Sequence, residues 1–270
     1  MSVSELSLQE SSWLQKNKSA EIFAELELLL RDICSRLNVS SKVENYGIQH
    51  PHSSQTEKFV LTSRVNQDAL KATVTLLDEN IVQSEISLKH SKVPGGIFRS
   101  VANPNVQWKI QQLQDTGNQC ARALQITIKF GKQRYEKCVQ RNGYDSQSEQ
   151  LLLSVLESVK SLVSDARTCL TMPRKKSLLE LCQFQPTKSF VPPLPHDILL
   201  SYYISSTKLV CAAYQVITMK TSGTQSVSVY QAEAHLPHLV DVLHHINAIF
   251  SRVQDLTTKF NLLKLRIDSL

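Results

Sequence analysis

Three side chains near the end of the chain have the types and the spacing of a metal site. His238, Asp241 and His245 are three and four residues apart, so on a helix they would lie on one face. Two imidazoles and a carboxylate suit zinc, and a histidine cluster can also sense pH. The same stripe would border the apolar face of the helix, where polar residues are expected without any ligand. These residues leave a metal-dependent enzyme, a pH sensor and a plain polar flank as alternatives.

The familiar signatures of catalysis and nucleotide binding are missing from the sequence. It has no glycine-rich phosphate loop, no G-x-S-x-G turn and no H-E-x-x-H pair. None of its six cysteines forms a C-x-x-C pair, which argues against a zinc ribbon or a redox site. The chain begins Met-Ser-Val-Ser-Glu, without a basic and apolar leader. We therefore expect a cytoplasmic, non-enzymatic protein with reduced thiols, no cofactor and no metal.

The net charge of +6 raises the question of a nucleic-acid or anionic-membrane partner. The cations are spread thinly along the chain, and the densest cluster is Arg174-Lys175-Lys176. Three cations are far fewer than binding to a phosphate backbone requires, so we expect a solvated loop there and no nucleic acid. The most apolar long window, 198–219, contains Lys208 and many hydroxyl groups, which favours burial in protein over a membrane span.

Two apolar segments are the candidate partner-binding sites. Trp108, with Gln111 and Gln112, would begin an amphipathic helix, and its ring would lie beside the apolar face of that helix. There the ring can anchor a partner, or it can pack at a junction between lobes. Phe190, Pro193 and Leu194 belong to the second segment. Its prolines suit an extended docking ligand, and an apolar strap laid over the core is the alternative.

Periodicity in the sequence predicts both helices and strands. Apolar residues recur every three or four positions over five stretches, which predicts helices at 6–37, 104–141, 145–170, 196–220 and from 236 to the end. Alternation predicts a meander of three strands with a turn at 78–80, and a later strand that would extend the same sheet: 58–62, 70–76, 81–88 and 227–232.

The last helix has the most regular heptad pattern. Its apolar seam is Leu236, Leu239, Leu243, Ile246, Phe250, Val253, Thr257 and Phe260. A zipper dimer that binds DNA would need a basic helix before the seam, and residues 227–234 carry no cation. We expect the seam to pack within the chain, with a leucine-zipper-like nuclear or transcriptional regulator as the alternative function.

These elements predict an α+β protein with an elongated, two-lobed body, a long-helix bundle plus a small, mainly antiparallel β-sheet lobe. The expected parts are the N-terminal helix and linker, the meander, the helical bundle, the returning strand and the last helix. Their bounds are 1–56, 57–92, 104–220 with a linker at 171–195, 226–233 and 235–270.

Four stretches of this chain are similar to the Rogdi family. Gln107–Asp115 resembles the family's tryptophan with paired glutamines, and Phe190–Leu200 its apolar, proline-punctuated entry into a long helix. The stretch Tyr203–Gln215 and the leucine-rich C-terminal end are compatible with the same family.

The resemblance implies a non-enzymatic adaptor with an elongated fold. Such a protein would be the small subunit of a RAVE-type complex that promotes assembly of the vacuolar-type proton ATPase, and so regulates acidification of vacuoles, endosomes and synaptic vesicles. The implied partners are a large WD-repeat-containing scaffold and peripheral subunits of the ATPase. Membrane association would come only through these partners, and the nuclear envelope is a second implied location.

Overall fold

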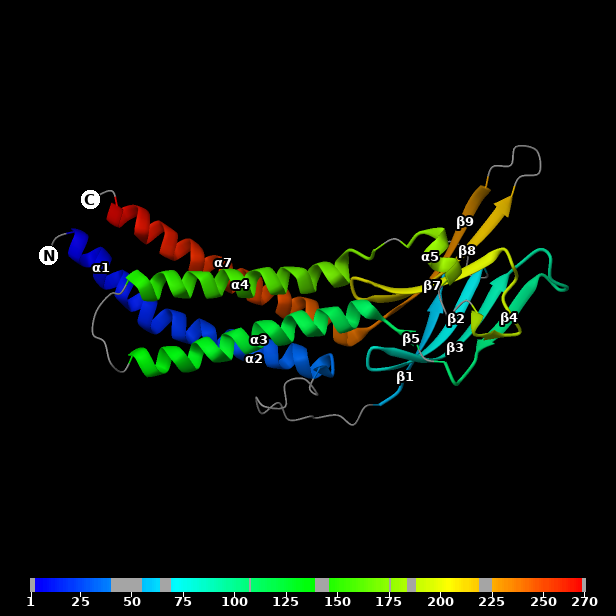
Figure 1. Cartoon of the computed structure of the whole chain (residues 1–270), viewed down its shortest axis with the longest axis horizontal. Helices are drawn as coiled ribbons and strands as arrows, with labels where there is room; N and C mark the ends of the chain where they lie inside the picture. The colour runs from blue at the N-terminus through cyan, green and yellow to red at the C-terminus, as the bar shows by residue number, and fades with distance from the viewer. Residues whose placement is uncertain are drawn as a thin grey trace. The chain divides into compact units, whose positions relative to one another are not determined.

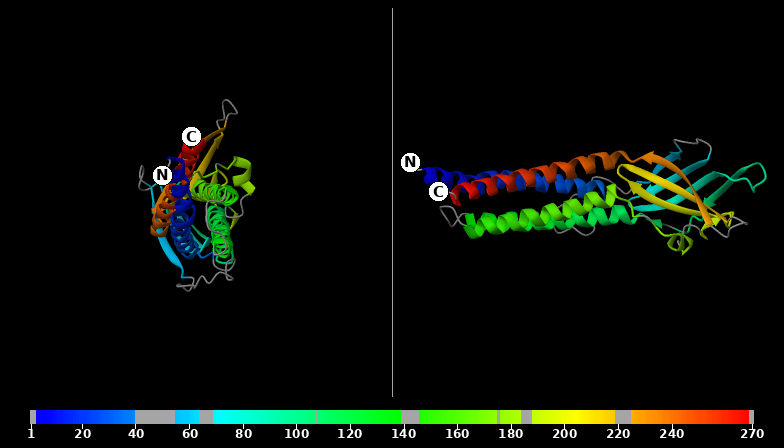
Figure 2. Two further views of the ribbon diagram at one scale, coloured as in Figure 1. Left: turned by 90° about the vertical axis from the view of Figure 1, so that its left-hand side faces the viewer. Right: turned by 90° about the horizontal axis from the view of Figure 1, so that it is seen from above.

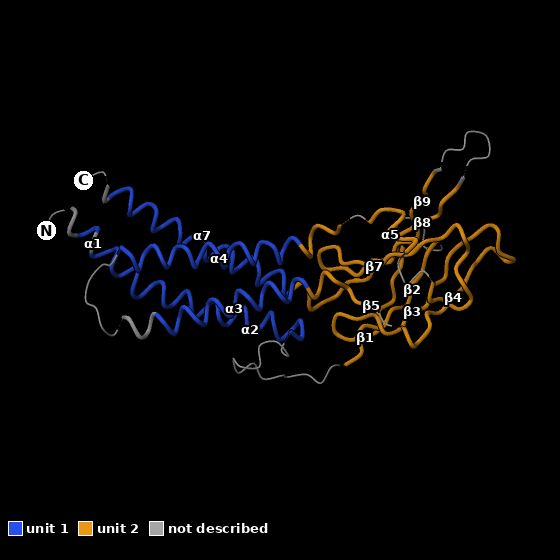
Figure 3. The backbone as a smooth tube through the Cα atoms, viewed as in Figure 1, with its two compact units in different colours: residues 1–50, 115–168, 241–270 blue, residues 51–114, 169–240 orange. Residues whose placement is uncertain are grey.

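The computed structural model divides the chain into two compact units (Figure 3). We call residues 1–50, 115–168 and 241–270 the helical unit, and residues 51–114 and 169–240 the sheet unit. The structure describes residues 3–39, 55–63, 69–106, 108–138, 146–174, 176–183, 188–218 and 225–268. A helical unit and a sheet unit confirm the predicted α+β class.

Among the described residues, the sheet unit contains one nine-stranded sheet whose neighbouring strands pair antiparallel (Figure 1). Its strands are β1 Glu57–Thr62, β2 Leu70–Leu77, β3 Asn80–Lys89, β4 Ile97–Ala102, β5 Trp108–Lys109, β6 Phe190–Val191, β7 Ile198–Ser205, β8 Lys208–Thr218 and β9 Gln225–His235. The strand order is β6-β4-β3-β2-β1-β9-β8-β7, with β5 paired to β3 outside this path. A short helix, α5 Leu178–Gln183, contacts β7.

The predicted meander and the predicted returning strand are confirmed. β1, β2 and β3 pair in sequence, and Asp78 turns the chain between the last two with a positive φ of 54°. β9 joins the same sheet beside β1, where Thr62 pairs with Glu233. The alternating burial of β2 follows directly from its alternating apolar residues.

The predicted helix over 196–220 is wrong, because these residues form the hairpin of β7 and β8. Both faces of β7 are buried, so its sequence is a continuous apolar run without the alternation that marks a half-exposed strand. A run of this kind can be a buried helix or a buried strand by periodicity alone. Ser206, with a positive φ of 60°, turns the chain at a position that a helix would have continued through.

Two further predictions need correction in this unit. The helix expected from 104 begins at Gln111, and Trp108 lies on the short strand β5. Strand β4 was not among the strands predicted from the sequence. The sheet is accordingly larger than predicted.

The sheet curls so that distant strands face one another. Ser84 on β3 and Tyr202 on β7 lie far apart in the strand order, yet their hydroxyl oxygens are 2.7 Å apart and both side chains are buried. Burial raises the pKa of Tyr202 well above its usual value, so its hydroxyl stays neutral. The inner face therefore closes on itself and forms the core of the unit.

The helical unit is built from long helices that run side by side in the views of Figures 1 and 2. They are α1 Val3–Trp13, a π-helical turn η1 Leu14–Lys18, α2 Ser19–Arg36, α3 Gln111–Cys138, α4 Ser146–Thr171 and α7 Pro237–Asp268. These confirm four of the five predicted helices, with α3 starting later than expected. The boundary between the two units falls inside α3, α4 and α7.

Ion pairs fix the register of α2 against α7. Glu25 pairs with Arg252 at 3.0 Å, Asp32 with His245 at 3.0 Å, and Arg36 with Asp241 at 2.7 Å. The residue numbers of the α2 partners increase as those of the α7 partners decrease, so the two helices are antiparallel. Such partly exposed pairs contribute little stability each, and their value here is in selecting one register.

Gly117 on α3 is a point of close approach between two parts of the helical unit. A Cβ atom at this position would clash with Cγ2 of Val39, which follows α2. Gly131, also on α3, has nothing within 4 Å of such an atom. The two glycines of this helix therefore differ in what a side chain would meet.

Gly117→Ala is expected to lower the free energy of unfolding by about 1–3 kcal/mol, because Val39 cannot move away without loss of packing. Gly131→Ala, in the same helix, is expected to raise it by up to about 1 kcal/mol through helix propensity. Urea denaturation followed by circular dichroism compares the two. Adding Val39→Ala should recover most of the loss, and equal responses of both glycines would contradict this packing.

Candidate partner-binding site

Trp108 lies at the centre of an aromatic stack in the sheet unit. Its ring is 5.7 Å from that of Phe190 and 5.6 Å from that of Tyr202, with interplanar angles of 24° and 14°. Trp108 is 5% exposed and Phe190 2% exposed. The three residues come from β5, β6 and β7. Strands β6 and β7 are the two ends of the strand order, and β5 pairs with β3, so the stack connects both ends of the sheet to β3.

Gln112 holds the first turn of α3 to two other elements. Its amide nitrogen donates to the carbonyl oxygens of Cys169 and Ile204, at 2.8 Å each, and its amide oxygen accepts from the backbone nitrogen of Ile204 at 2.7 Å. The end of α4 and strand β7 are thereby fixed to α3. The side-chain amide of Gln112 is thus engaged in hydrogen bonds within the fold. We call this arrangement the Gln112 clamp.

The remaining candidates are more accessible. Gln111 is exposed and donates to Gln114 on the next turn of α3, at 3.2 Å. Pro193 is exposed and Leu194 is partly exposed, just after the residues of β6. Of the six residues, the structure brings Trp108 and Phe190 into direct contact. Binding of a partner by any of them stays a prediction, and Gln107 lies outside the described residues.

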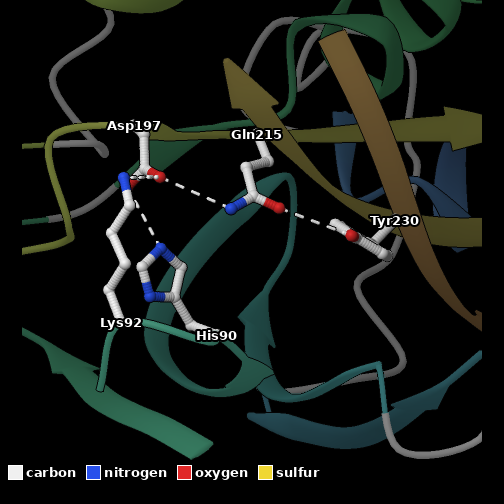
Figure 4. A network of polar contacts seen from close by, with 5 residues as sticks. All are labelled: His90, Lys92, Asp197, Gln215 and Tyr230. Carbon is white, nitrogen blue, oxygen red and sulfur yellow. Dashed lines mark hydrogen bonds and ion pairs between the residues drawn. The ribbon is translucent and has the colours of Figure 1, made fainter. Parts of the chain in front are cut away.

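A second polar cluster, which sequence reasoning missed, surrounds Asp197 just before β7 (Figure 4). Its carboxylate accepts from Lys92 at 2.9 Å and from the amide of Gln215 at 3.4 Å, and lies 3.1 Å from Nε2 of His90. Tyr230 donates to the amide oxygen of Gln215 at 3.4 Å. The cluster therefore links the end of β3 to β7, β8 and β9 where the sheet closes. Asp197 lies in the stretch Phe190–Leu200, but nothing in its spacing indicated partners more than 100 residues away.

Burial alone would raise the pKa of Asp197, but the hydrogen bonds from Lys92, Gln215 and His90 outweigh it and lower the pKa to about 2. A carboxyl whose pKa is lowered on folding stabilises the protein above its unfolded pKa, near 3.8, and loses this contribution as the pH falls towards 2. The whole shift would correspond to about 2.4 kcal/mol at about 1.4 kcal/mol per unit. Lys92 is 72% exposed, so solvent screening should reduce this to about 1 kcal/mol.

Asp197→Asn is therefore expected to cost about 1 kcal/mol at neutral pH and almost nothing near pH 2. Urea unfolding of both proteins across this pH range measures the difference. Asp255→Asn, at an exposed position on α7, is the control and should change little at either pH. A difference that persists undiminished at the lowest pH would contradict the assignment.

Two of the three metal candidates contact charged side chains of α2. Asp241 contacts Arg36 and His245 contacts Asp32, as described for the helical unit. Among the residues that the structure describes, no three His, Cys, Asp or Glu side chains form a group that could hold a metal ion. The polar-flank interpretation accounts for Asp241 and His245.

The buried thiols have no sign of activation. Burial raises the pKa of Cys34 and that of Cys211 to about 12, so both are protonated at neutral pH. Five cysteines are free thiols in the described structure: Cys34, Cys120, Cys169, Cys182 and Cys211.

No helix in the described ranges has a stretch long and apolar enough to cross a membrane.

Comparison with known proteins decides the family. The family model described as "Rogdi leucine zipper containing protein" matches residues 10–261. The chain belongs to the Rogdi family. It is 42% identical to the "Protein rogdi homolog" of Caenorhabditis elegans over 257 residues, which cover 92% of this chain and 85% of that protein. It is 32% identical to "Protein rogdi" of Drosophila melanogaster over 239 residues, covering 88% and 81%, and 24% identical to the Homo sapiens homologue over 218 residues, covering 81% and 70%.

The two Rogdi-like stretches meet in space. Trp108 of the first stacks on Phe190 of the second, and Gln112 of the first bonds to Ile204 just beyond the second. In this Rogdi chain, both stretches therefore build the core of the sheet unit. Their residue types are explained by packing and by hydrogen bonds to backbone atoms.

The zipper-like helix of this Rogdi chain buries its seam within the chain, as expected. The buried residues of α7 are Leu239, Val242, Ile246, Ile249, Val253, Leu256 and Phe260. This seam keeps the predicted heptad spacing, but every second position is shifted by one residue. Leu243, Phe250 and Thr257 were predicted in the seam and are only partly buried, and the residue before each of them is buried instead. A second copy could not pair through it while these side chains remain in the fold.

Proposed function

We propose that this Rogdi-family chain is a non-enzymatic adaptor subunit of a RAVE-like complex that promotes assembly of the vacuolar-type proton ATPase. Membership of the Rogdi family over nearly the whole chain is the observation that carries the proposal. The adaptor would bind a large WD-repeat-containing scaffold and peripheral subunits of the ATPase, and through them regulate organelle acidification. It would reach vacuolar, endosomal or synaptic-vesicle membranes from the cytoplasm only through these partners.

The structure is compatible with a protein that works by presenting surfaces. The polar side chains singled out as candidates are engaged in structural contacts: Gln112 with backbone atoms, Asp241 and His245 with α2. Surfaces held by a curled sheet and a helical bundle are preformed, which reduces the entropic cost of binding. An adaptor needs this property, and the ATP that drives the pump would be spent by the pump.

The experiment is affinity purification of the full chain, expressed at its natural level, with mass spectrometry of the proteins recovered. The proposal expects the WD-repeat-containing scaffold and peripheral ATPase subunits in fixed proportion to the chain. Recovery of chromatin proteins instead would favour the nuclear regulator. A chain that elutes alone, while folded by circular dichroism, would also refute the adaptor function.

A further inference from the structure

Four cations are gathered on one face of the sheet, although the sequence spreads them over more than forty positions. Lys58 lies on β1, Lys71 on β2, Lys89 on β3 and Arg99 on β4, and all four side chains are exposed. Directly paired residues on neighbouring strands share a face. Lys71 pairs with Ser87, which pairs with Arg99, and Lys89 is two residues from Ser87, so these three cations share the outer face.

The outer face also holds the fourth cation. Lys58 pairs with Thr75 and Thr75 with Gln83, a residue on the same face of β3 as Ser87. Neighbouring strands are about 4.8 Å apart and alternate residues about 6.7 Å, so the backbone positions of Lys71, Lys89 and Arg99 lie roughly 8–12 Å from one another. We call these four side chains the basic face.

Three of the four cations of the basic face are poorly compensated. Lys58, Lys89 and Arg99 have no ion-pair partner among the residues that the structure describes. One carboxylate, Glu85, lies on the same face of β3, where it pairs with Val101 of β4. Since unpaired cations on one surface raise its potential together, the face attracts an anionic partner more strongly than the chain's modest net charge suggests.

Three exposed valines lie on one row of the same face, with Thr73 and Glu85 between Val60 and the other two. Val60 pairs with Thr73, Thr73 with Glu85, Glu85 with Val101, and Val101 with Val191. Val60 is 63% exposed, Val101 42% and Val191 65%. Exposed aliphatic side chains bordered by unpaired charge are a composition typical of a protein interface, where the apolar part supplies affinity and the charges supply orientation.

We propose that the basic face binds an acidic segment of a partner protein, one whose carboxylates meet Lys71, Lys89 and Arg99 and whose apolar side chains lie on Val101 and Val191. This inference rests on the proposed function in treating the chain as an adaptor, and names the chemistry of one partner surface. A protein fits better than a lipid bilayer, because the residues of β1–β4 on this face include no aromatic side chain to enter a membrane interface.

Zero-length cross-linking tests the contact directly. A water-soluble carbodiimide joins a lysine amine to a carboxylate only where the two already touch. Applied to the complex purified with the full chain, it should link Lys71 and Lys89 to aspartates or glutamates of one segment of a partner, identified by mass spectrometry. Absence of such links in a complex whose other subunits cross-link to the chain would overturn the proposal.

Charge reversal supplies a second, quantitative readout. The triple variant Lys71→Glu, Lys89→Glu, Arg99→Glu should reduce partner recovery at least tenfold, with a steep dependence on salt in the wild type. The matched control reverses three exposed cations of α3, Arg122→Glu, Lys129→Glu and Lys132→Glu, and should leave recovery unchanged. Both variants are first shown to fold by circular dichroism.

The outcomes separate this inference from the proposed function. Loss of the WD-repeat-containing scaffold or of ATPase subunits only in the basic-face variant supports both. Undiminished recovery of those proteins overturns the basic face and leaves the adaptor function standing. Cross-links to the acidic segment of some other protein, lost on charge reversal, support the basic face and refute the adaptor function. Binding to phosphatidylserine vesicles, lost on reversal and without protein cross-links, would overturn the proposal in favour of a membrane.

Discussion

Replacing Trp108 with alanine is expected to lower the free energy of unfolding by about 3–5 kcal/mol, the usual cost of emptying a large aromatic site in a core. The Trp108 ring stacks with two aromatic neighbours, Phe190 and Tyr202, so the loss includes the stacking as well as the buried area. Urea denaturation followed by far-ultraviolet circular dichroism measures the change.

The chain supplies its own control for this experiment in its second tryptophan. Trp13 on α1 is 54% exposed, so Trp13→Ala should cost less than about 1 kcal/mol. Fluorescence gives an independent check, because the protein that keeps only Trp13 should emit at longer wavelength than the protein that keeps only Trp108. If Trp108→Ala abolished partner recovery while leaving stability unchanged, the ring would be a contact residue and its structural role would be wrong.

Replacing Gln112 is the second change expected to have a large effect. Gln112→Ala leaves the backbone nitrogen of Ile204 and the carbonyl oxygens of Ile204 and Cys169 without their side-chain partner. Unsatisfied, partly buried groups of this kind cost about 1–3 kcal/mol, so we expect a loss of about 2–4 kcal/mol for the clamp as a whole. Gln112→Glu should be at least as damaging, because a carboxylate would face two carbonyl oxygens without a proton to donate.

Gln111→Ala is the matched control for the clamp, since Gln111 is exposed on the same turn of α3. It should change the free energy of unfolding by less than about 0.5 kcal/mol. Hydrogen exchange of the Ile204 amide gives a local readout, and its protection should fall in Gln112→Ala and not in Gln111→Ala. Equal effects of the two substitutions would show that the clamp contributes nothing.

Much of the fold could be predicted from local patterns. The meander from β1 to β3 alternates clearly, and α4 and α7 have uninterrupted heptad spacing, so their bounds were found within a few residues. The hairpin of β7 and β8 was missed for a tertiary reason. Its strands are buried on both sides, partly by α5, and a sequence with apolar residues on every side carries no period that separates a strand from a helix.

The candidate site shows the same limit. The sequence singled out Trp108 and Phe190, but it could not show that their rings stack, since their proximity depends on the curling of the sheet. The basic face escaped notice because Lys71, Lys89 and Arg99 are distant in sequence and only the register of three strands aligns them. The cluster Arg174-Lys175-Lys176 was more conspicuous only because its members are adjacent in the chain.

We propose that the chain promotes assembly of the vacuolar-type proton ATPase by binding its partners. The most direct measurement is the share of peripheral ATPase subunits found on membranes in cells that lack the chain, before and after the wild-type chain is restored. We expect this share to fall without the chain, to recover with the wild type and with the α3 control variant, and not to recover with the basic-face variant. An unchanged share of membrane-bound peripheral subunits in cells without the chain would contradict it.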